Sequence, residues 1–461
     1  MRRWIMKKLT ILLLLLVLLV GCTQSQETEP LEAPKQVVQT KDHDPYRIEY
    51  DAVSDTDTTH DIKVIETTQT FNSQTSNRYM YTDQDNTAYP AGYPIVVKKD
   101  TALTLNVENQ TQTDTNIHWH GLSLPNDQDG PALLINPQQT FQYKFTPDYQ
   151  GTYWYHSHNR PVRDQVDFGM YGPLVILEPE DAKYTIDQIL VIDDWAVNQV
   201  SGHMQIEGDT DTVNGKTGSE IKPISFNNTD LVKLRFIQAA TAKSTVISFP
   251  FEVNVTHTDG MPLEAPFKTT ELEIAPGERY DVELTHQGNT NETFAITNDR
   301  NQGFKIPLIY EVKEEGNPQT TTNQQPSLYQ IAETAIPQQP NVSIRMGSTM
   351  SRGMGHEWTL NDEVFPNTES FNLQKDTVYR IRFTNENRMN NHPMHIHGAH
   401  FKILSVNGET VEKTVWKDTV DVPAGSSIDI AIQFKNPGEW MLHCHILDHE
   451  DGGMMTSIIV E

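Results

Sequence analysis

The sequence predicts an all-β protein built as three consecutive β-sandwich domains. Short runs in which apolar and polar residues alternate, such as residues 103–107 and 378–383, are bounded by Asn, Asp, Gly and Pro, as strands are. Long amphipathic helical patterns are nearly absent, which favours antiparallel sandwiches. One local pattern, a Pro-containing turn followed by alternating apolar residues, also recurs three times at domain-sized intervals.

The first segment, residues 1–21, is predicted to be an export signal. Two arginines and two lysines precede the apolar run 9–20, which is too short to span a bilayer comfortably. The run ends in Leu19-Val20-Gly21-Cys22, which resembles a bacterial lipobox and implies cleavage before Cys22 with lipid on its thiol. We therefore expect an exported protein, lipid-anchored to the outer face of the bacterial cytoplasmic membrane. The alternative is an ordinary leader with an incidental cysteine.

Residues 22–45 are predicted to be the acylated cysteine and a flexible tether. The stretch is rich in Gln, Glu, Thr and Pro, a composition that stays solvated. The whole chain carries a net charge of -27, so no nucleic-acid partner is expected. If Cys22 carries lipid, Cys444 is left as the other cysteine, so no intramolecular disulfide is available and Cys444 needs another role.

The remaining chain is divided with the help of the recurring turn. Its copies are Ile135-Asn136-Pro137, Ile274-Ala275-Pro276 and Val422-Pro423. We predict domains at 46–182, 183–315 and 342–461, with a linker rich in Gln, Thr, Asn and Pro at 316–341. The first and third domains each contain two His-x-His pairs, whereas the middle domain contains none and is interpreted as a spacer.

The histidine pairs are the clearest chemical feature of the sequence. They are His118/His120, His156/His158, His395/His397 and His443/His445. Because alternate side chains of a strand point to one face, each pair presents two imidazoles in one direction. A single pair is common by chance, but four pairs matched between two repeated domains indicate metal binding. Imidazole suits copper, iron, nickel and zinc, so the histidines alone do not select the metal.

Cys444 is the residue that selects the metal. It lies between the two histidines of the last pair, so its side chain points to the opposite face of the strand and serves a second site. The spacing allows His449, Met454 and His392 to complete that site. Two histidines, one cysteine and a weak axial methionine are typical of blue copper used in electron transfer.

Together these motifs resemble the four copper-binding motifs of three-domain bacterial multicopper oxidases, a family of laccase-like enzymes and copper oxidases, here in a lipoprotein form. The matching segments are His118-Trp119-His120-Gly121, His156-Ser157-His158, His392-Pro393-Met394-His395-Ile396-His397-Gly398, and His443-Cys444-His445-Ile446-Leu447-Asp448-His449 followed by Met454. The resemblance implies cupredoxin-like Greek-key sandwiches and four copper ions. It also implies an oxidase that couples four one-electron oxidations of a donor to the reduction of O2 to water.

The resemblance further implies which residues bind each copper. Type 1 copper is expected on His392, Cys444, His449 and Met454, and type 2 copper on His118 and His395. One type 3 copper is expected on His120, His156 and His445, and the other on His158, His397 and His443. Ser157 stands where Cys444 stands in the last domain, so only the last domain is expected to form a type 1 site.

Electrons and protons are expected to reach the cluster through different residues. Cys444 would pass each electron through its neighbours His443 and His445. Asp129 and Glu450 match the positions of the family's proton-relay carboxylates. The alternatives are a plain turn residue for Asp129 and a solvated loop charge for Glu450.

The sequence leaves the electron donor open. Phenols, aromatic amines, Cu(I), Fe(II) and Mn(II) are donors of relatives with these motifs. Met346, Met350 and Met354 could bind Cu(I) through their thioethers, or could simply pack in the entry strand of the third domain. Met389 precedes the type 1 histidine in a shifted place, without the Asp found in cuprous-oxidising relatives.

Two other functions are weighed beside the oxidase, which is expected to be a monomer. A copper-binding, copper-tolerance protein would need the metal sites but no path from donor to O2. A relative that had lost copper would lack ligands, whereas every family ligand position is filled here. A copper buffer also has no need of a cysteine flanked by two cluster histidines.

Overall fold

The computed structural model describes residues 44–461, apart from 72–73, 148, 196–207, 209, 299–302, 314–319, 323–329 and 352–354. The predicted leader, Cys22 and nearly all of the tether lie outside the described residues, as do Met354 and parts of the predicted linker. Within the described residues, no helix has the length and apolar character needed to cross a membrane.

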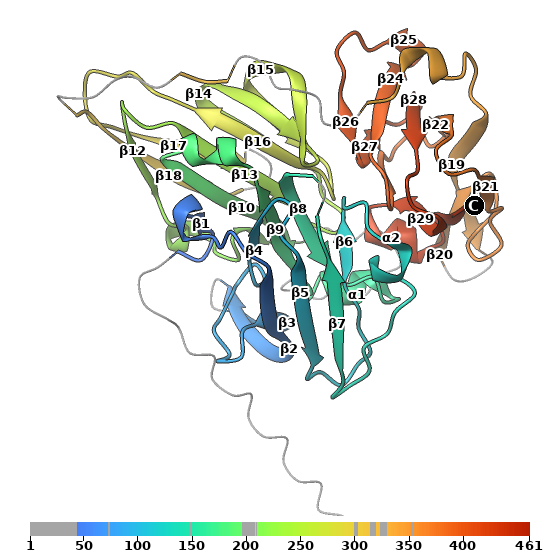
Figure 1. Cartoon of the computed structure of the whole chain (residues 1–461), viewed down its shortest axis with the longest axis horizontal. Coiled ribbons are helices and arrows are strands. Elements are labelled where there is room, and N and C mark those ends of the chain that lie inside the picture. Colours follow the sequence, from blue (N-terminus) through green and yellow to red (C-terminus); the bar gives the residue numbers. More distant parts are fainter. Residues whose placement is uncertain are drawn as a thin grey trace, which may run out of the picture. The chain divides into compact units, whose positions relative to one another are not determined.

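Strands make up 52% of the structure and helices 7%, which confirms the all-β prediction. In the described residues the strands form five sheets, which fall into three groups along the chain. Figure 1 shows these groups in blue to teal, in green to yellow, and in orange to red, except that the blue β1 (Arg47–Ile48) joins the middle group. Short 3-10 turns lie between strands at Tyr50–Ala52, Asn126–Gln128, Pro179–Lys183, Gly218–Glu220 and Glu333–Ala335.

The first group is a pair of four-stranded sheets. One contains, in spatial order, β3 (Gln74–Thr82), β2 (Thr58–Phe71), β5 (Leu103–Asn109) and β7 (Thr140–Phe145), and the other contains β4 (Ile95–Lys98), β9 (Tyr171–Leu177), β8 (Gly151–His156) and β6 (His118–His120). Alternate residues of β5 are buried, so one face of its sheet joins the core. Strands β6, β8 and β9 are buried throughout, which places the histidine strands inside the protein.

The middle group is a single ten-stranded sheet. Its order is β1 (Arg47–Ile48), β10 (Ile186–Trp195), β13 (Val232–Gln238), β16 (Arg279–Leu284), β14 (Thr245–Thr258), β17 (Glu292–Asn298), β18 (Lys305–Glu311) and β12 (Ile224–Asn227), with β11 (Thr210–Val213) on β10 and β15 (Met261–Ile274) on β14. The pairing register of β14 shifts between Ser248 and Val253, and such irregularities bend a strand. The sheet shares one core, which includes Leu234, Phe249 and Ile306.

The third group is a seven-stranded sheet packed on a five-stranded sheet. The first contains β20 (Gly355–Leu360), β19 (Val342–Ser351), β22 (Val378–Asn385), β28 (Ser427–Gln433), β24 (Phe401–Val406) and β25 (Glu409–Thr410), with β26 (Trp416–Lys417) on β24; the second contains β21 (Phe371–Leu373), β30 (Met455–Val460), β29 (Gly438–Cys444), β23 (His392–Ile396) and β27 (Thr419–Val422). Their common core includes Phe383, Ile430, Trp440 and Cys444. The predicted thiol therefore lies inside the third sandwich.

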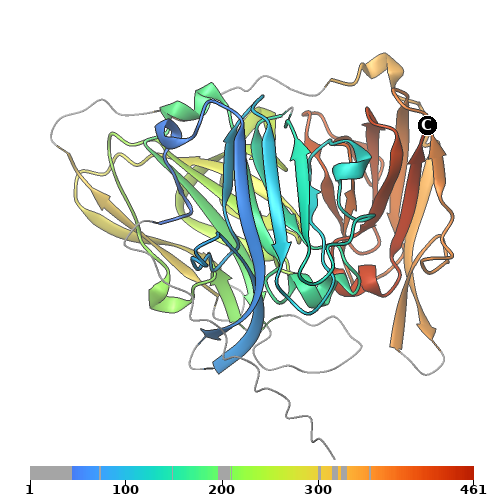
Figure 2. The same ribbon diagram turned by 60° about the horizontal axis from the view of Figure 1, so that its bottom comes forward.

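The first and third groups contact each other through two short helices, one from each group. Helix α1 (Val162–Val166) follows the histidines of β8, helix α2 (Leu447–Asp451) follows those of β29, and the two helices contact each other (Figure 2). The Asp451 carboxylate accepts hydrogen bonds of 3.0 Å from the backbone N–H groups of Val162 and Arg163. These bonds satisfy free donors at the start of α1 and fix the two histidine loops relative to each other.

Candidate metal centre

Two strand pairs with the same register carry the predicted histidines. In the first domain β6 pairs with β8 and aligns His118 with His156, and in the third domain β23 pairs with β29 and aligns His395 with His443. Within each His-x-His pair the ring centroids are 4.9–6.0 Å apart, as expected for side chains on one side of a strand. The two sets face each other, and the structure brings together every histidine that the sequence assigns to the cluster.

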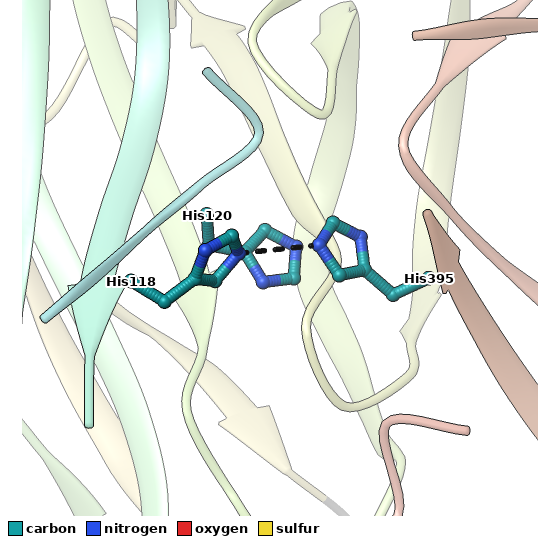
Figure 3. A group of neighbouring side chains, drawn as sticks. All are labelled: His118, His120 and His395. Atoms are coloured by element: carbon teal, nitrogen blue, oxygen red, sulfur yellow. Dashed lines mark hydrogen bonds between the residues drawn. The ribbon is translucent and has the colours of Figure 1, made fainter. Parts of the chain in front are cut away.

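The closest approach between the two domains joins His118 and His395. Their Nε2 atoms are 3.4 Å apart (Figure 3). The Nδ1–H groups donate to the backbone carbonyls of Asp129, at 3.1 Å, and Asp418, at 2.9 Å. A neutral imidazole with its proton on Nδ1 has its lone pair on Nε2. Two lone pairs therefore point at each other across the domain boundary, and a cation between them would remove their repulsion.

A second group has the same arrangement. The Nε2 atom of His443 lies 3.1 Å from that of His397 and 3.3 Å from that of His158. Nδ1 of His397 is 2.8 Å from a carboxylate oxygen of Asp129, and Nδ1 of His443 is 3.1 Å from the carbonyl of Cys444. These partners orient the imidazoles and again leave Nε2 atoms facing one another.

A third group consists of His120, His156 and His445, whose nearest nitrogens all lie within 4.8 Å of one another. Nδ1 of His120, Nε2 of His156 and both ring nitrogens of His445 are buried and find no hydrogen-bond partner among the described residues. Buried polar groups without partners are rare in folded proteins. His120 also lies within this distance of His118 and His395 (Figure 3), so it belongs to two groups.

Burial keeps most of these imidazoles neutral. It lowers the pKa of His395 to about 3, and it lowers the pKa values of His120, His156, His158, His397 and His445 well below their usual range, assisted by neighbouring histidines. His443 differs from these six. Burial lowers its pKa, but the Glu450 carboxylate, the Cys444 carbonyl and Asp129 together raise the pKa by more than burial lowers it. Neutral imidazole is the form that binds a metal.

The Cys444 site lies on the other side of β29. The Cys444 sulfur is 3.6 Å from Nδ1 of His392 and 3.5 Å from Nδ1 of His449, and these two nitrogens are 3.1 Å apart. The Cys444 N–H donates to the carbonyl of Met454 at 3.1 Å, and the Met454 side chain is fully buried. Trp358 of β20 packs on the His449 ring, with centroids 3.6 Å apart. Burial raises the pKa of the Cys444 thiol, so a bound cation would be needed to hold it as thiolate.

The two predicted proton-relay carboxylates contact cluster histidines. One Asp129 oxygen is 3.3 Å from Nδ1 of His118 and the other is the partner of His397 described above. The oxygens of Glu450 lie 3.0 Å from Nδ1 of His443 and 3.5 Å from Nε2 of His158. Glu450 is fully buried, so the alternative of a solvated loop charge does not fit.

Sequence reasoning missed a second set of residues around the cluster. Asp418 and Thr419 contact His120, while Arg279 of the supposed spacer domain forms a buried ion pair with Asp418. His400 is also buried, with its Nε2 atom 3.5 Å from a carboxylate oxygen of Asp418. The sequence contains only a partial signal for these residues, which is that both Arg279 and Asp418 lie close to copies of the recurring turn.

The methionines considered as Cu(I) ligands have different environments. Met346 is fully buried in the core of the third domain, so packing explains it. Met350, on the same strand, is 71% exposed, and Met389 is 89% exposed. Only these two present thioethers to solvent among the methionines considered whose placement is described.

The donor set of these sites fits copper. A thiolate with two imidazoles and a nearby methionine is the ligand set of a blue copper centre, and imidazole nitrogens alone suit further copper ions. Facing Nε2 lone pairs and buried nitrogens without partners are the features that bound cations would satisfy. The geometry therefore supports a copper centre with a cluster shared between the first and third domains.

Comparison with known proteins points in the same direction. Family models described as multicopper oxidase match residues 64–181, 188–322 and 321–461. Multicopper oxidase MmcO of Mycobacterium tuberculosis is 27% identical over 407 residues, or 77% of this chain and 79% of the relative. Laccase-5 of Trametes versicolor is 26% identical over 424 residues, or 76% of this chain and 79% of the relative.

The fold comparison agrees with the sequence comparison. A Campylobacter jejuni multicopper oxidase, described as a metallo-oxidase, superposes with a TM-score of 0.75 at 22% identity, covering 93% of this chain and 96% of that one. Structural neighbours of this kind have three cupredoxin-like domains, which confirms the predicted fold class.

Proposed function

The chain belongs to the multicopper oxidase family, and from this we propose that the gathered histidines, Cys444 and Met454 hold the family's four copper ions. The protein is a laccase-like oxygen oxidoreductase, which couples oxidation of a donor to reduction of O2. The observation that carries the ligand proposal is the pair of Nε2 atoms of His118 and His395, which face each other at 3.4 Å from different domains.

The proposed ligand sets are those that the resemblance implies. They are His392, Cys444, His449 and Met454 for type 1 copper, His118 and His395 for type 2 copper, and His120, His156 and His445 with His158, His397 and His443 for the type 3 pair. Each type 3 set corresponds to one group whose nitrogens converge. Bound copper would supply one-electron redox chemistry at each site.

Cys444 is proposed to connect the two kinds of site. Its sulfur faces His392 and His449, while its sequence neighbours His443 and His445 face the cluster. An electron that enters at the sulfur therefore needs to cross only one residue of covalent chain in either direction. Trp358, which packs on His449 and is partly exposed, provides an outer surface where a donor could approach.

Asp129 and Glu450 are proposed to deliver protons. Reduction of O2 to two waters consumes four electrons and four protons, so each electron from the donor must be matched by a proton. Both carboxylates contact cluster imidazoles from buried positions. From these positions they would hold protons beside the cluster, as a general acid requires.

The donor class can be tested directly by oxygen uptake. Copper-loaded protein is given Cu(I), Fe(II), Mn(II) or a dimethoxyphenol, with Cys444→Ser as the control that lacks the type 1 ligand set. Uptake by the parent protein and none by the control would support the proposed entry of electrons, and the preferred donor would distinguish metal oxidase from laccase. Absence of uptake with every donor, at full copper occupancy, would contradict the oxidase.

We also propose that the protein is exported and anchored through lipid on Cys22. The proposal rests on the sequence, in which a basic start and an apolar run precede Leu19-Val20-Gly21-Cys22. Cys22→Ala should move the protein from the membrane fraction into the soluble or secreted fraction, with oxidase activity retained. A variant that has lost its leader and still stays with the membrane would show that Cys22 is not the anchor.

A further inference from the structure

All three domains meet at one buried ion pair beside the cluster. Arg279, the first residue of β16 in the middle domain, donates from Nη1 and Nη2 to the two carboxylate oxygens of Asp418 at 2.7 and 2.6 Å. Arg279 and Asp418 are 0% and 1% exposed. Parallel bonds of this kind fix geometry as well as charge. Asp418 directly precedes β27 of the third domain, which pairs with the strand of His395.

The ion pair acts on a first-domain histidine. Nε2 of His120 lies 3.1 Å from Asp418 and 3.0 Å from the Thr419 hydroxyl, whereas its Nδ1 has no hydrogen-bond partner among the described residues. A neutral imidazole that donates from Nε2 has its lone pair on Nδ1. His118, His156, His395, His397 and His443 instead use Nδ1 for their oxygen partners. His120 therefore requires the opposite tautomer, and Asp418 is the acceptor that selects it.

The middle domain holds this acceptor from several directions. Arg279 also donates to the Thr152 carbonyl of the first domain at 3.2 Å and to the Gly277 carbonyl at 3.1 Å. The Asp259 carboxylate accepts from the backbone N–H groups of Asp418 and Thr419, each at 3.2 Å. Both the side chain and the backbone of Asp418 are thus fixed by middle-domain residues.

Two glycines provide the room that this arrangement needs. A Cβ on Gly121, which follows His120 and has φ +90°, would collide with both Arg279 and Asp418. A Cβ on Gly277 would lie 2.8 Å from the His445 ring. The middle domain therefore packs directly against His445, and it reaches His120 of the same proposed type 3 set through the ion pair between Arg279 and Asp418.

We propose that Arg279 is a positioning residue for one type 3 copper. By holding Asp418 through two parallel bonds, it keeps His120 in the tautomer and orientation that present Nδ1 to the copper shared with His156 and His445. This rests on the ligand sets proposed above. The middle domain then supplies no ligand itself, but it supports a ligand through that ligand's hydrogen-bond partner. Loss of a hydrogen-bond partner of a metal ligand weakens metal binding by about 10–100-fold.

The test is Arg279→Lys, which keeps the positive charge but cannot make two parallel bonds. The copper content of the holoenzyme is measured against increasing chelator, together with its blue absorption and its electron paramagnetic resonance spectrum. We expect one copper per chain to leave at about 10–100-fold lower chelator concentration than in the parent protein. Blue absorption should persist, and a new paramagnetic signal should appear because the remaining type 3 copper has lost its coupled partner.

Arg235→Lys is the matched control. Arg235 is equally buried, lies in the same domain and forms two parallel bonds of 2.7 Å with Asp187, yet contacts no cluster histidine. This variant should lose stability without the selective copper loss. Equal copper loss in both variants would mean that general destabilisation is responsible and would overturn the proposal, as would parental chelator resistance in Arg279→Lys.

A second variant covers the case in which Arg279→Lys fails to fold. Arg279→Gln combined with Asp418→Asn removes both charges together, so no buried charge is left without its partner. It should show the same selective loss, and full retention of the type 3 pair would contradict the proposal. The proposed function fails separately, if the parent protein itself binds no copper or lacks the blue absorption.

Discussion

Strands β8 and β29 are corresponding strands of the first and third domains, and they have different roles. Each begins at a glycine with φ near +145°, Gly151 and Gly438, and each runs into a His-x-His pair that faces the cluster. Between the histidines stands Ser157 in the first copy and Cys444 in the second. The two copies therefore contribute alike on one face and differ on the other.

The helix after each strand supplies the partner of that middle residue. Gln165 of α1 accepts a hydrogen bond of 2.5 Å from the Ser157 hydroxyl, so the polar group of the first copy is satisfied within its own domain. In the second copy α2 brings His449 to 3.5 Å from the Cys444 sulfur. The middle residue and its helical partner both differ between the copies, so a structural hydrogen bond in the first copy corresponds to a proposed metal site in the second.

The largest effect is expected when the second copy is made to resemble the first. Cys444→Ser removes the only thiolate ligand of the described chain, so blue absorption and oxygen uptake should both be abolished. The cluster histidines on the other face should still bind copper, and three coppers per chain should be measured in place of four. Persistent blue absorption would mean that the thiolate is not a ligand.

The next effect tests Glu450, the carboxylate of α2 that contacts cluster histidines. Glu450→Gln keeps the shape of the side chain but cannot carry a proton, so reoxidation of the reduced enzyme by O2 should slow by about 10²–10⁴-fold. Blue absorption and its bleaching by the donor should stay unchanged, because Cys444 faces the other side. Stopped-flow absorbance separates the two steps.

Asp448→Asn is the control for this prediction, since Asp448 lies on the same helix and pairs with Arg163 rather than with the cluster. It should reoxidise at the parental rate. Asp129→Asn should behave like Glu450→Gln, because Asp129 also contacts cluster histidines. Parental reoxidation in both Asp129 and Glu450 variants would exclude them as relays.

The difference between β8 and β29 could be predicted from the sequence, because it depends on local features of each strand. Period-two alternation alone puts the two histidines of each pair on one face and Cys444 on the other. The all-β class and the three domains follow from patterns of the same local kind. Assignment of ligands to each copper needed the family resemblance, since spacing cannot say which imidazole of one domain meets which of the other.

The ion pair between Arg279 and Asp418 could not be predicted in this way. Its partners are separated by 139 residues and meet only through the packing of three domains. A middle domain without His-x-His pairs gave no reason to expect a contact with the cluster. The two environments of Met346 and Met350 show the same limit, because the pattern of the strand does not say where its sheet ends.

The smallest effect is expected when the first copy is made to resemble the second. Ser157→Cys places a thiol where no imidazole stands opposite, since Gln165 and Thr115 surround the position. We expect no second blue centre, and a loss of about 1 kcal/mol from the exchanged hydrogen bond, which lowers the melting temperature by a few degrees. Ser157→Ala, which loses the same bond without gaining a thiol, should melt at a similar temperature. A doubled blue absorption per chain in Ser157→Cys would mean that the cysteine alone creates the site, and that the helical partner, His449 in the second copy, is dispensable.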